Sequence, residues 1–440
     1  MTRLAAAAAV SVAAGQGLEA AETAIRAGLL RLGGGVLEDL LAADPGYRGP
    51  RVCCGAGHQA QFAGYRDKTV GTVLGPVRLR RAWYHCAACG HGSAPRDEQL
   101  GVTGQGMSAG LRKMTARAAA AVPFAAAARL ISELAGITLT GKRAGRRAEA
   151  DGQAAAAVIE ARSAAAAARQ VILMPGGDPP DKLYIAIDGT GVPMVATETE
   201  GRDGKGEDGK AHTREVKMAV AFTQATVNEE GFPVRDPGSS SYLATFAPAA
   251  GFGTLMAAEA CRRGAGRARQ LTILGDGAVW IWNLAAQHFP AATQIVDLFH
   301  AREHLHELAN LAARLLSTGK QDWTAARLAE LDNGDIPALL AAGRDLRFIG
   351  SLATERDKAL HYFETNAHRM HYAWYRKHGL FVGSGTVEAG CKSVIGQRLK
   401  LSGMRWTEHG ATGILTLRCQ EASNRWDEIW PQSRDQTQAA

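Results

Sequence analysis

Aliphatic residues recur at three-, four- or seven-residue spacing between Gln16 and Leu41. Residues at this spacing share one face of an α-helix, so we expect an amphipathic helix that ends at Asp44-Pro45-Gly46. The residues of this apolar face are Leu18, Ile25, Leu29, Leu32, Val36 and Leu40.

The pattern then changes to short alternating runs. Residues 69–74 and 77–84 predict two strands joined as a hairpin at Gly75-Pro76.

Helical periodicity returns over residues 108–122 and 124–135, and the segment 136–140 separates them from a further helical stretch with a basic beginning. Helix, glycine-containing turn and basic helix form the helix-turn-helix pattern, which places the second helix in the major groove of DNA. The alternative is a plain helical hairpin with a solvated basic face. The candidate DNA contacts are Lys142, Arg143, Arg146 and Arg147.

The helical pattern continues over residues 153–169, and the Pro/Gly-rich segment 175–180 then predicts the main domain boundary. Beyond it, strands alternate with helices, which is typical of an α/β sheet. The predicted strands are 183–187, 215–222, 271–274 and 293–298, with helices at 255–263 and from about Ala278.

Composition describes a globular protein, because 440 residues with 46% hydrophobic and 21% charged side chains allow two to four domains. No run is apolar and long enough to span a bilayer, and the alanine-rich stretch Leu4 to Ala14 lacks the strongly apolar core of a secretory signal. The first 150 residues hold 19 Lys and Arg against 10 Asp and Glu, whereas the remainder holds 31 against 33. The basic excess predicts that the N-terminal third contacts a polyanion.

The seven cysteines do not form a disulfide framework, because their number is odd and three of them are isolated. This predicts a reduced, cytoplasmic protein. Cys53-Cys54 and Cys86-x-x-Cys89 lie on either side of the predicted hairpin, which would bring them to one point as in a zinc ribbon. We therefore expect a structural Zn²⁺ ion. Its predicted ligands are Cys54, His58, Cys86 and Cys89, with Cys53 an alternative to Cys54 and His91 an alternative to His58.

Two aspartates follow apolar strands of the C-terminal half, Asp188 in Asp-Gly-Thr-Gly and Asp276 in Gly-Asp-Gly. Close carboxylates repel unless a divalent cation lies between them, so their convergence predicts Mg²⁺ or Mn²⁺. Glu388, in the first turn of a predicted helix, offers a third carboxylate among basic residues, an arrangement that suits bound phosphates. The basic candidates here are Lys392, Arg398 and Lys400.

Five segments together resemble the ISKra-type bacterial insertion-sequence transposases, which are similar to the Mutator-like group of DDE transposases. The likeness runs from about Leu18 to Trp430. The segments are 187–194 (Ile-Asp-Gly-Thr-Gly-Val-Pro-Met), 213–217, 274–283, 295–304 and 381–392.

The resemblance implies a ribonuclease H-like α/β catalytic core over residues 181–440, with a helical insertion at about 300–380. It makes Asp188, Asp276 and Glu388 the metal-binding triad. Asp297-x-x-His300 matches a signature of the group, and His300 becomes a candidate DNA contact. The implied N-terminal modules are a helical segment (1–50), a zinc-ribbon-like module (51–105) and a helix-turn-helix-like DNA-binding region (106–175).

The family often has Cys-x-Cys in the first knuckle, whereas Gly55 and Ala56 follow Cys54 here, so His58 is the substitute ligand. The resemblance predicts metal-dependent cleavage and strand transfer at terminal inverted repeats. The expected partners are double-stranded DNA, both terminal repeats and target, and further copies of the chain in the synaptic complex. No membrane partner is expected, and the location would be the nucleoid.

Two other functions stay open at this point. One is a DNA-binding protein derived from a transposase whose catalytic site has decayed. The other is a zinc metallopeptidase, because His300, Glu303 and His304 form an inverted His-x-x-Glu-His motif.

Overall fold

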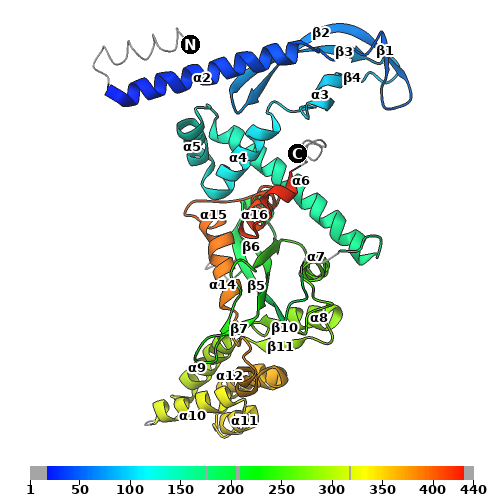
Figure 1. Cartoon of the computed structure of the whole chain (residues 1–440). Coiled ribbons are helices and arrows are strands. Elements are labelled where there is room, and N and C mark those ends of the chain that lie inside the picture. The colour runs from blue at the N-terminus through cyan, green and yellow to red at the C-terminus, as the bar shows by residue number, and fades with distance from the viewer. Residues whose placement is uncertain (1–16, 174–176, 205–208, 317–318, 431–440) are drawn as a thin grey trace. The chain divides into compact units, whose positions relative to one another are not determined.

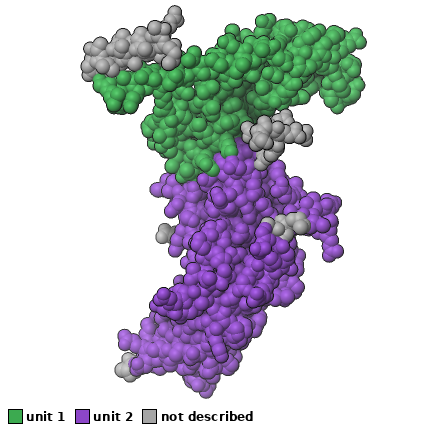
Figure 2. Space-filling model, in the orientation of Figure 1, with its two compact units in different colours: residues 1–151 green, residues 152–440 purple. Residues whose placement is uncertain are grey.

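The computed structural model describes residues 17–173, 177–204, 209–316 and 319–430. The chain divides into two compact units, residues 1–151 and 152–440 (Figure 2). The stretch Leu4 to Ala14 lies outside the described residues, as does part of the segment 175–180. Among the described residues, no helix combines the length and apolarity that crossing a membrane requires.

The first described element of the first unit is the predicted amphipathic helix, α2 (Gly17–Ala42), which packs on an antiparallel sheet (Figure 1). Val73 and Leu74 make the hairpin turn, because Thr72 pairs with Gly75. The turn therefore precedes the predicted Gly75-Pro76, which instead begins a strand. The four strands, in sheet order, are β1 (Arg51–Cys53), β2 (Gln59–Thr72), β3 (Gly75–His85) and β4 (Gly92–Ser93), followed by the short helix α3 (Pro95–Gln99).

Three helices follow: α4 (Ala109–Ala121), α5 (Phe124–Ala135) and α6 (Gly141–Ala167). Gly136 ends α5 in the left-handed conformation, with φ 70° and ψ 20°, a common helix ending that favours glycine. The helical stretch predicted over 153–169 is the continuation of α6 rather than a separate helix.

The division between the compact units falls inside α6, at Asp151 and Gly152, and not in the segment 175–180. The second half of α6 packs on helix α16 (Glu408–Ala422), where Gln153 donates a hydrogen bond to the carbonyl of His409. A Cβ atom at Gly152 would lie 2.0 Å from the carbonyl oxygen of Gly413. Only glycine permits this close approach.

A mixed five-stranded sheet forms the centre of the second unit, so the predicted α/β class is confirmed. β5 is central; β6 and β9 add antiparallel on one side, and β10 and β11 add parallel on the other. The strands are β5 (Lys182–Pro193), β6 (Thr213–Gln224), β9 (Ser241–Thr245), β10 (Gln270–Gly275) and β11 (Thr293–Val296), beside the small pair β7 (Thr226–Val227) and β8 (Pro233–Val234).

Helices cover both faces of this sheet (Figure 1). Met218 of β6 contacts Cys391 on one face, and Lys217 lies over the Trp280 ring on the other. The first face is covered by α14 (Gly385–Gly390), a π-helical turn (Cys391–Gly396), α15 (Gln397–Leu399) and α16, and the second by α7 (Ala249–Arg262) and α8 (Val279–His288).

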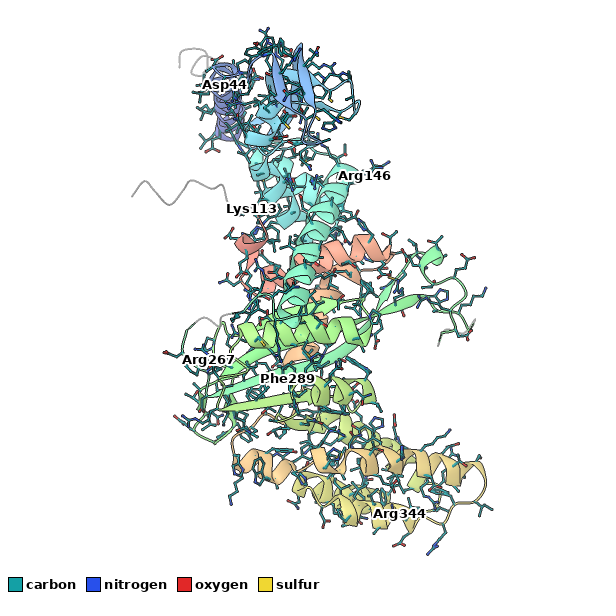
Figure 3. The ribbon with its side chains drawn as sticks, turned by 90° about the vertical axis from the view of Figure 1, so that its right-hand side faces the viewer. Asp44, Lys113, Arg146, Arg267, Phe289 and Arg344 are labelled. Atoms are coloured by element: carbon teal, nitrogen blue, oxygen red, sulfur yellow. The ribbon has the colours of Figure 1, made fainter. Side chains whose placement is uncertain are left out.

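The chain between β11 and α14, which includes the helical insertion expected at about 300–380, contains helices and no strands among its described residues. Its helices are α9 (Leu298–Ala312), α10 (Lys320–Asn333), α11 (Ile336–Arg344), α12 (Ser351–Asn366) and α13 (Tyr372–Lys377). Figure 3 shows this helical part beside Arg344, apart from the sheet.

Candidate active site and metal-binding groups

The two predicted aspartates lie side by side because of the register between β5 and β10. The last pair of this parallel ladder joins Ala186 to Leu274, and Asp188 and Asp276 each follow two positions further along the chain. Each pair is separated by the same 88 residues (274 − 186 and 276 − 188). β5 continues to Pro193 while β10 ends at Gly275, so Asp188 lies where its neighbouring strand stops.

A third aspartate occupies the same level of the sheet. Gly275 pairs with Val296 of β11, so Asp276 and Asp297 follow at equivalent positions. Asp297 is fully buried and begins α9, where its Oδ1 accepts hydrogen bonds from the backbone N–H groups of Phe299 and His300. The sequence match to Asp-x-x-His therefore marks a helix cap at the edge of the site.

Asp297 also connects the sheet to the helix that carries Glu388. Its Oδ2 accepts hydrogen bonds from both the backbone N–H and the hydroxyl of Ser384. The Ser384 hydroxyl lies 3.3 Å from Oε1 of Glu388, one turn further along. Sequence reasoning missed Ser384, which precedes the first residue of the helix that carries Glu388.

Burial raises the pKa of Asp188, and the negative charge of Asp276 raises it further, against hydrogen bonds from the Gly189 N–H and the Cys391 thiol. The Cys391 Sγ lies 3.5 Å from Asp188 Oδ2, and burial followed by the Asp188 charge raises the pKa of this thiol to about 12. The thiol is therefore a neutral donor. The Asp188 carboxylate sits where a positive charge would be stabilising.

Asp297 and His300 shift each other's pKa in opposite directions, and both shifts favour the charged form. Burial alone would raise the pKa of Asp297, but the adjacent His300 imidazole and hydrogen bonds from Ser384 outweigh it and lower the pKa. Asp297 in turn raises the pKa of His300 to about 9. The Nδ1 of His300 lies 3.8 Å from Oδ2 of Asp297, an ion-pair distance, so His300 is a cation at neutral pH.

The predicted triad is brought together only in part. Asp188 and Asp276 are neighbours, but the carboxylate oxygens of Asp188, Asp276 and Glu388 do not all lie within 4.8 Å of one another. Glu388 instead forms such a group with Asp297 and His300. Asp188 and Asp276 offer oxygen donors of the type that Mg²⁺ and Mn²⁺ prefer, at a position where burial and repulsion oppose a bare negative charge.

The two histidines of the peptidase-like motif have different partners. His304 packs against the Tyr362 ring at a centroid distance of 3.9 Å, and its Nδ1 lies 3.4 Å from Glu307. Among the described residues, His300 and His304 do not belong to one metal-binding group. The arrangement gives the metallopeptidase hypothesis no support.

The basic residues after Glu388 differ in exposure. Lys392 and Lys400 are exposed, and the Lys400 Nζ donates to the Thr190 hydroxyl on the strand that carries Asp188. Arg398 is fully buried, with its guanidinium over the Trp406 ring and beside the Met404 sulfur. This burial opposes the predicted contact of Arg398 with DNA, because the side chain belongs to the core.

The four predicted zinc ligands do form one group. Cys54, His58, Cys86 and Cys89 each offer a ligand atom within 4.8 Å of the others. The first pair lies between β1 and β2 and the second between β3 and β4, so the sheet joins residues 35 positions apart. The backbone N–H of Cys89 lowers the pKa of Cys86, which favours the thiolate that a metal binds. Three thiols and an imidazole suit a tetrahedral Zn²⁺ site.

The basic start of α6 contains both exposed and paired side chains. Lys142, Arg143 and Arg146 are exposed (Figure 3 labels Arg146), and a hollow of about 450 Å³ lies between them and Gly106. Arg147 is 20% exposed and donates to the buried carboxylate of Asp151. Its predicted contact with DNA is opposed by this pairing, which Arg112 shares.

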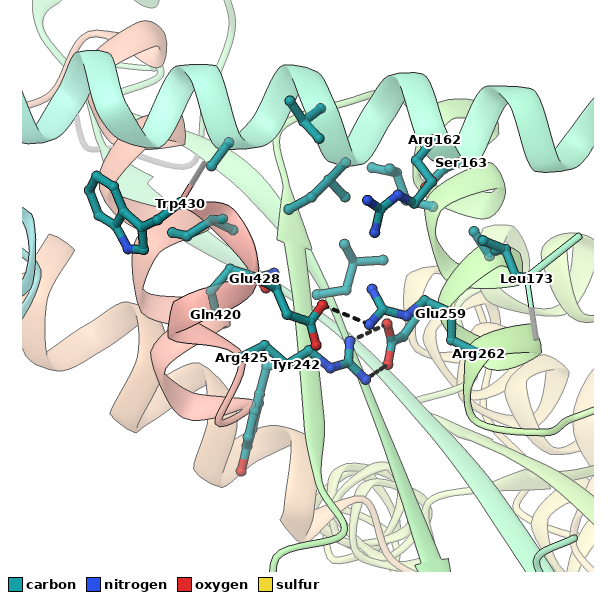
Figure 4. Close-up of a pocket in the computed structure, with 17 residues that line it drawn as sticks. Arg162, Ser163, Leu173, Tyr242, Glu259, Arg262, Gln420, Arg425, Glu428 and Trp430 are labelled. Carbon is teal, nitrogen blue, oxygen red and sulfur yellow. Dashed lines mark hydrogen bonds and ion pairs between the residues drawn. The ribbon is translucent and has the colours of Figure 1, made fainter. Parts of the chain in front are cut away.

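A separate hollow of about 260 Å³ lies between α6, β9 and α7 (Figure 4). Two ion pairs cross it, a bidentate one between Arg425 and Glu259 and another between Arg262 and Glu428. The hollow contains none of the residues predicted from the sequence, and its ion pairs link α7 to the C-terminal helical segment.

No protein-family model and no curated protein matches the chain.

Proposed function

We propose that this protein is a DDE transposase that cleaves and joins DNA at the terminal inverted repeats of an insertion sequence. The observation that carries the proposal is the strand register that sets Asp188 beside Asp276 at the level where the parallel strand β10 ends. A ribonuclease H-like core, which the sequence resemblance implies, needs paired carboxylates in such a sheet. Glu388 and the exposed lysines on the facing helix support the same reading.

Asp188, Asp276 and Glu388 would hold Mg²⁺ or Mn²⁺, which when bound supplies the charge that activates water and stabilises the leaving oxygen. The protein's other side chains bind the DNA and position the catalytic carboxylates. Lys392 and Lys400 are exposed cations that bind the DNA phosphates, and His300 adds a positive charge held by Asp297. Ser384 positions Glu388 through its hydroxyl.

The N-terminal unit would bind the terminal repeats. α5, the turn after Gly136 and the exposed basic start of α6 support a helix-turn-helix, with Lys142, Arg143 and Arg146 toward the DNA. A structural Zn²⁺ at Cys54, His58, Cys86 and Cys89 would tie the ends of the ribbon sheet.

The test uses the full chain, Mn²⁺ and labelled DNA carrying both ends of the element that encodes the protein. The wild type should cut at the element ends, whereas Asp188→Asn should bind these ends with nearly unchanged affinity and not cut them. A variant that cuts at the wild-type rate would show that the site is assigned wrongly. A wild type that binds the ends but never cuts them would favour the decayed, DNA-binding alternative.

A further inference from the structure

The apolar face of α2 is exposed rather than packed. Six aliphatic side chains along this helix retain 40% or more of their accessible surface. Their exposed fractions are Leu18 73%, Ile25 40%, Leu29 51%, Leu32 52%, Val36 51% and Leu40 66%.

These six side chains, here called the α2 stripe, lie within an arc of about 80° at 3.6 residues per turn. The opposite side of α2 is a packed one, because Gly34 lies against the Leu74 carbonyl and Leu41 joins the buried cluster around Leu79. A helix that faces a globular core normally has an apolar face of 100° or more, and a narrower stripe is typical of a coiled-coil seam.

Five of the six residues of the α2 stripe match such a seam, whose other a and d positions in this helix are Glu22 and Asp39. Ile25, Leu29, Leu32 and Val36 follow at four, three and four residues, which is the alternation of a and d positions, and Leu18 lies seven residues before Ile25. The partner that fits this repeat is a helix with the same repeat. A second copy of the chain supplies one, and a two-fold dimer places the same patch on both sides of the interface.

Charge and area narrow the choice of partner. α2 carries four acidic residues, Glu19, Glu22, Glu38 and Asp39, and two basic ones, Arg26 and Arg31, so the helix disfavours DNA or an anionic membrane. The stripe is about 33 Å long and a helix is about 10 Å wide, which gives about 330 Å² per copy. Two such faces bury about 660 Å², less than the roughly 1,000 Å² of a stable interface, so a dimer formed by them would be weak and reversible.

We infer that two copies of the chain associate through the α2 stripe, independently of DNA and of the proposed catalytic function. Sedimentation of the DNA-free full chain at about 10–100 μM, where such an interface is populated, should show a dimer. The double variant Leu29→Glu with Leu32→Glu should need at least a tenfold higher protein concentration than the wild type to form the dimer. Ile349→Glu, which changes an exposed aliphatic residue of the second unit, is the matched control and should leave the dimer intact.

Circular dichroism and metal content should be unchanged in all variants, because the substituted side chains point away from the ribbon. A monomeric wild type over the whole range would overturn the inference, as would a dimer that survives the double substitution. A wild-type monomer that dimerises on removal of residues 2–16 would also overturn it, since that segment would then cover the stripe in the same chain.

Discussion

Ser384 donates both its backbone N–H and its hydroxyl to one carboxylate oxygen of Asp297, across 87 residues of sequence. Asp297 precedes the helical insertion and Ser384 follows it, so this contact closes the loop that the insertion makes. The same hydroxyl reaches Glu388, and the contact therefore connects the end of β11 with the candidate catalytic helix.

Ser384→Ala should lower the free energy of unfolding by about 1–3 kcal/mol, because the buried Asp297 carboxylate loses one of its donors. Ser393→Ala is the control, since Ser393 donates only to the Ala389 carbonyl of the same helix. Urea unfolding of the two variants checks the prediction, and equal losses would contradict it.

Asp188→Asn should raise the melting temperature in the absence of divalent cations. The raised pKa of Asp188 means that its ionised form is disfavoured in the folded protein, so stability from this group is lost as pH rises above its unfolded pKa. Each kcal/mol recovered corresponds to about 2–4 °C or less in a chain of this size. Calorimetry with and without Mg²⁺ checks it: Mg²⁺ should stabilise the wild type more than the variant. A variant that melts below the wild type without cations would argue against the electrostatic account.

The imidazole of His300 should titrate near pH 9 in the folded protein. Because the folded pKa lies above the unfolded value of about 6.5, this ion pair contributes fully below that pH and is lost as pH rises through about 9. Asp297→Asn should move the His300 pKa back toward 6.5. Nuclear magnetic resonance of the histidine rings measures this pKa, and the signal missing from His300→Gln identifies the His300 resonance. A His300 pKa near 6.5 in the wild type would exclude the ion pair.

Purified protein should hold about one tightly bound zinc per chain, since the four ligands form a single site. Cys86→Ser with Cys89→Ser should abolish zinc binding and destabilise the first unit. Cys53→Ser should retain the metal, because Cys53 is exposed and lies outside the ligand group. Metal analysis decides between these outcomes, and a double variant that keeps its zinc would refute the ligand assignment.

Lys400→Ala and Arg398→Ala should act on different properties although the residues are two apart. Lys400 is exposed, so Lys400→Ala should reduce the salt dependence of DNA binding by about one unit of slope if the lysine contacts a phosphate. Arg398→Ala should leave that slope unchanged and lower stability, since it removes a buried side chain from Trp406. Titrations at several salt concentrations, with thermal melts, separate the two effects; an altered slope for Arg398→Ala would contradict its burial.

The sequence predicted the parts of the structure that local pattern determines. Apolar runs indicated β5, β6, β10 and β11, and the paired cysteine motifs indicated the ligand group around Cys86. Asp188 and Asp276 each come shortly after an apolar run, and this shared position reflects the register of two parallel strands.

Contacts between distant segments were not predictable in the same way. Nothing local to Arg398 distinguishes it from the exposed Lys400, because its burial depends on Trp406 and the packing of the C-terminal helices. The apolar side of α2 predicted a helix correctly but not which side would pack, since Gly33 and Gly34 make the contact with Leu74. β9, a five-residue strand, gave no periodic signal of its own.

The π-helical turn Cys391–Gly396 has a consequence for how this protein tolerates changes in length. Such a turn holds one residue more than a turn of α-helix. Its wide spacing is seen where the backbone N–H of Gln397 donates to the carbonyl of Lys392, five residues earlier. Deleting one residue within the turn would restore a regular helix with little rotation of the residues beyond it, because the wide turn already holds one residue more than an α-helical turn. Arg398 would then keep its direction toward the core. Loss of one residue is thus a milder change within this turn than in the regular helices on either side, where it would rotate the following residues by about 100°.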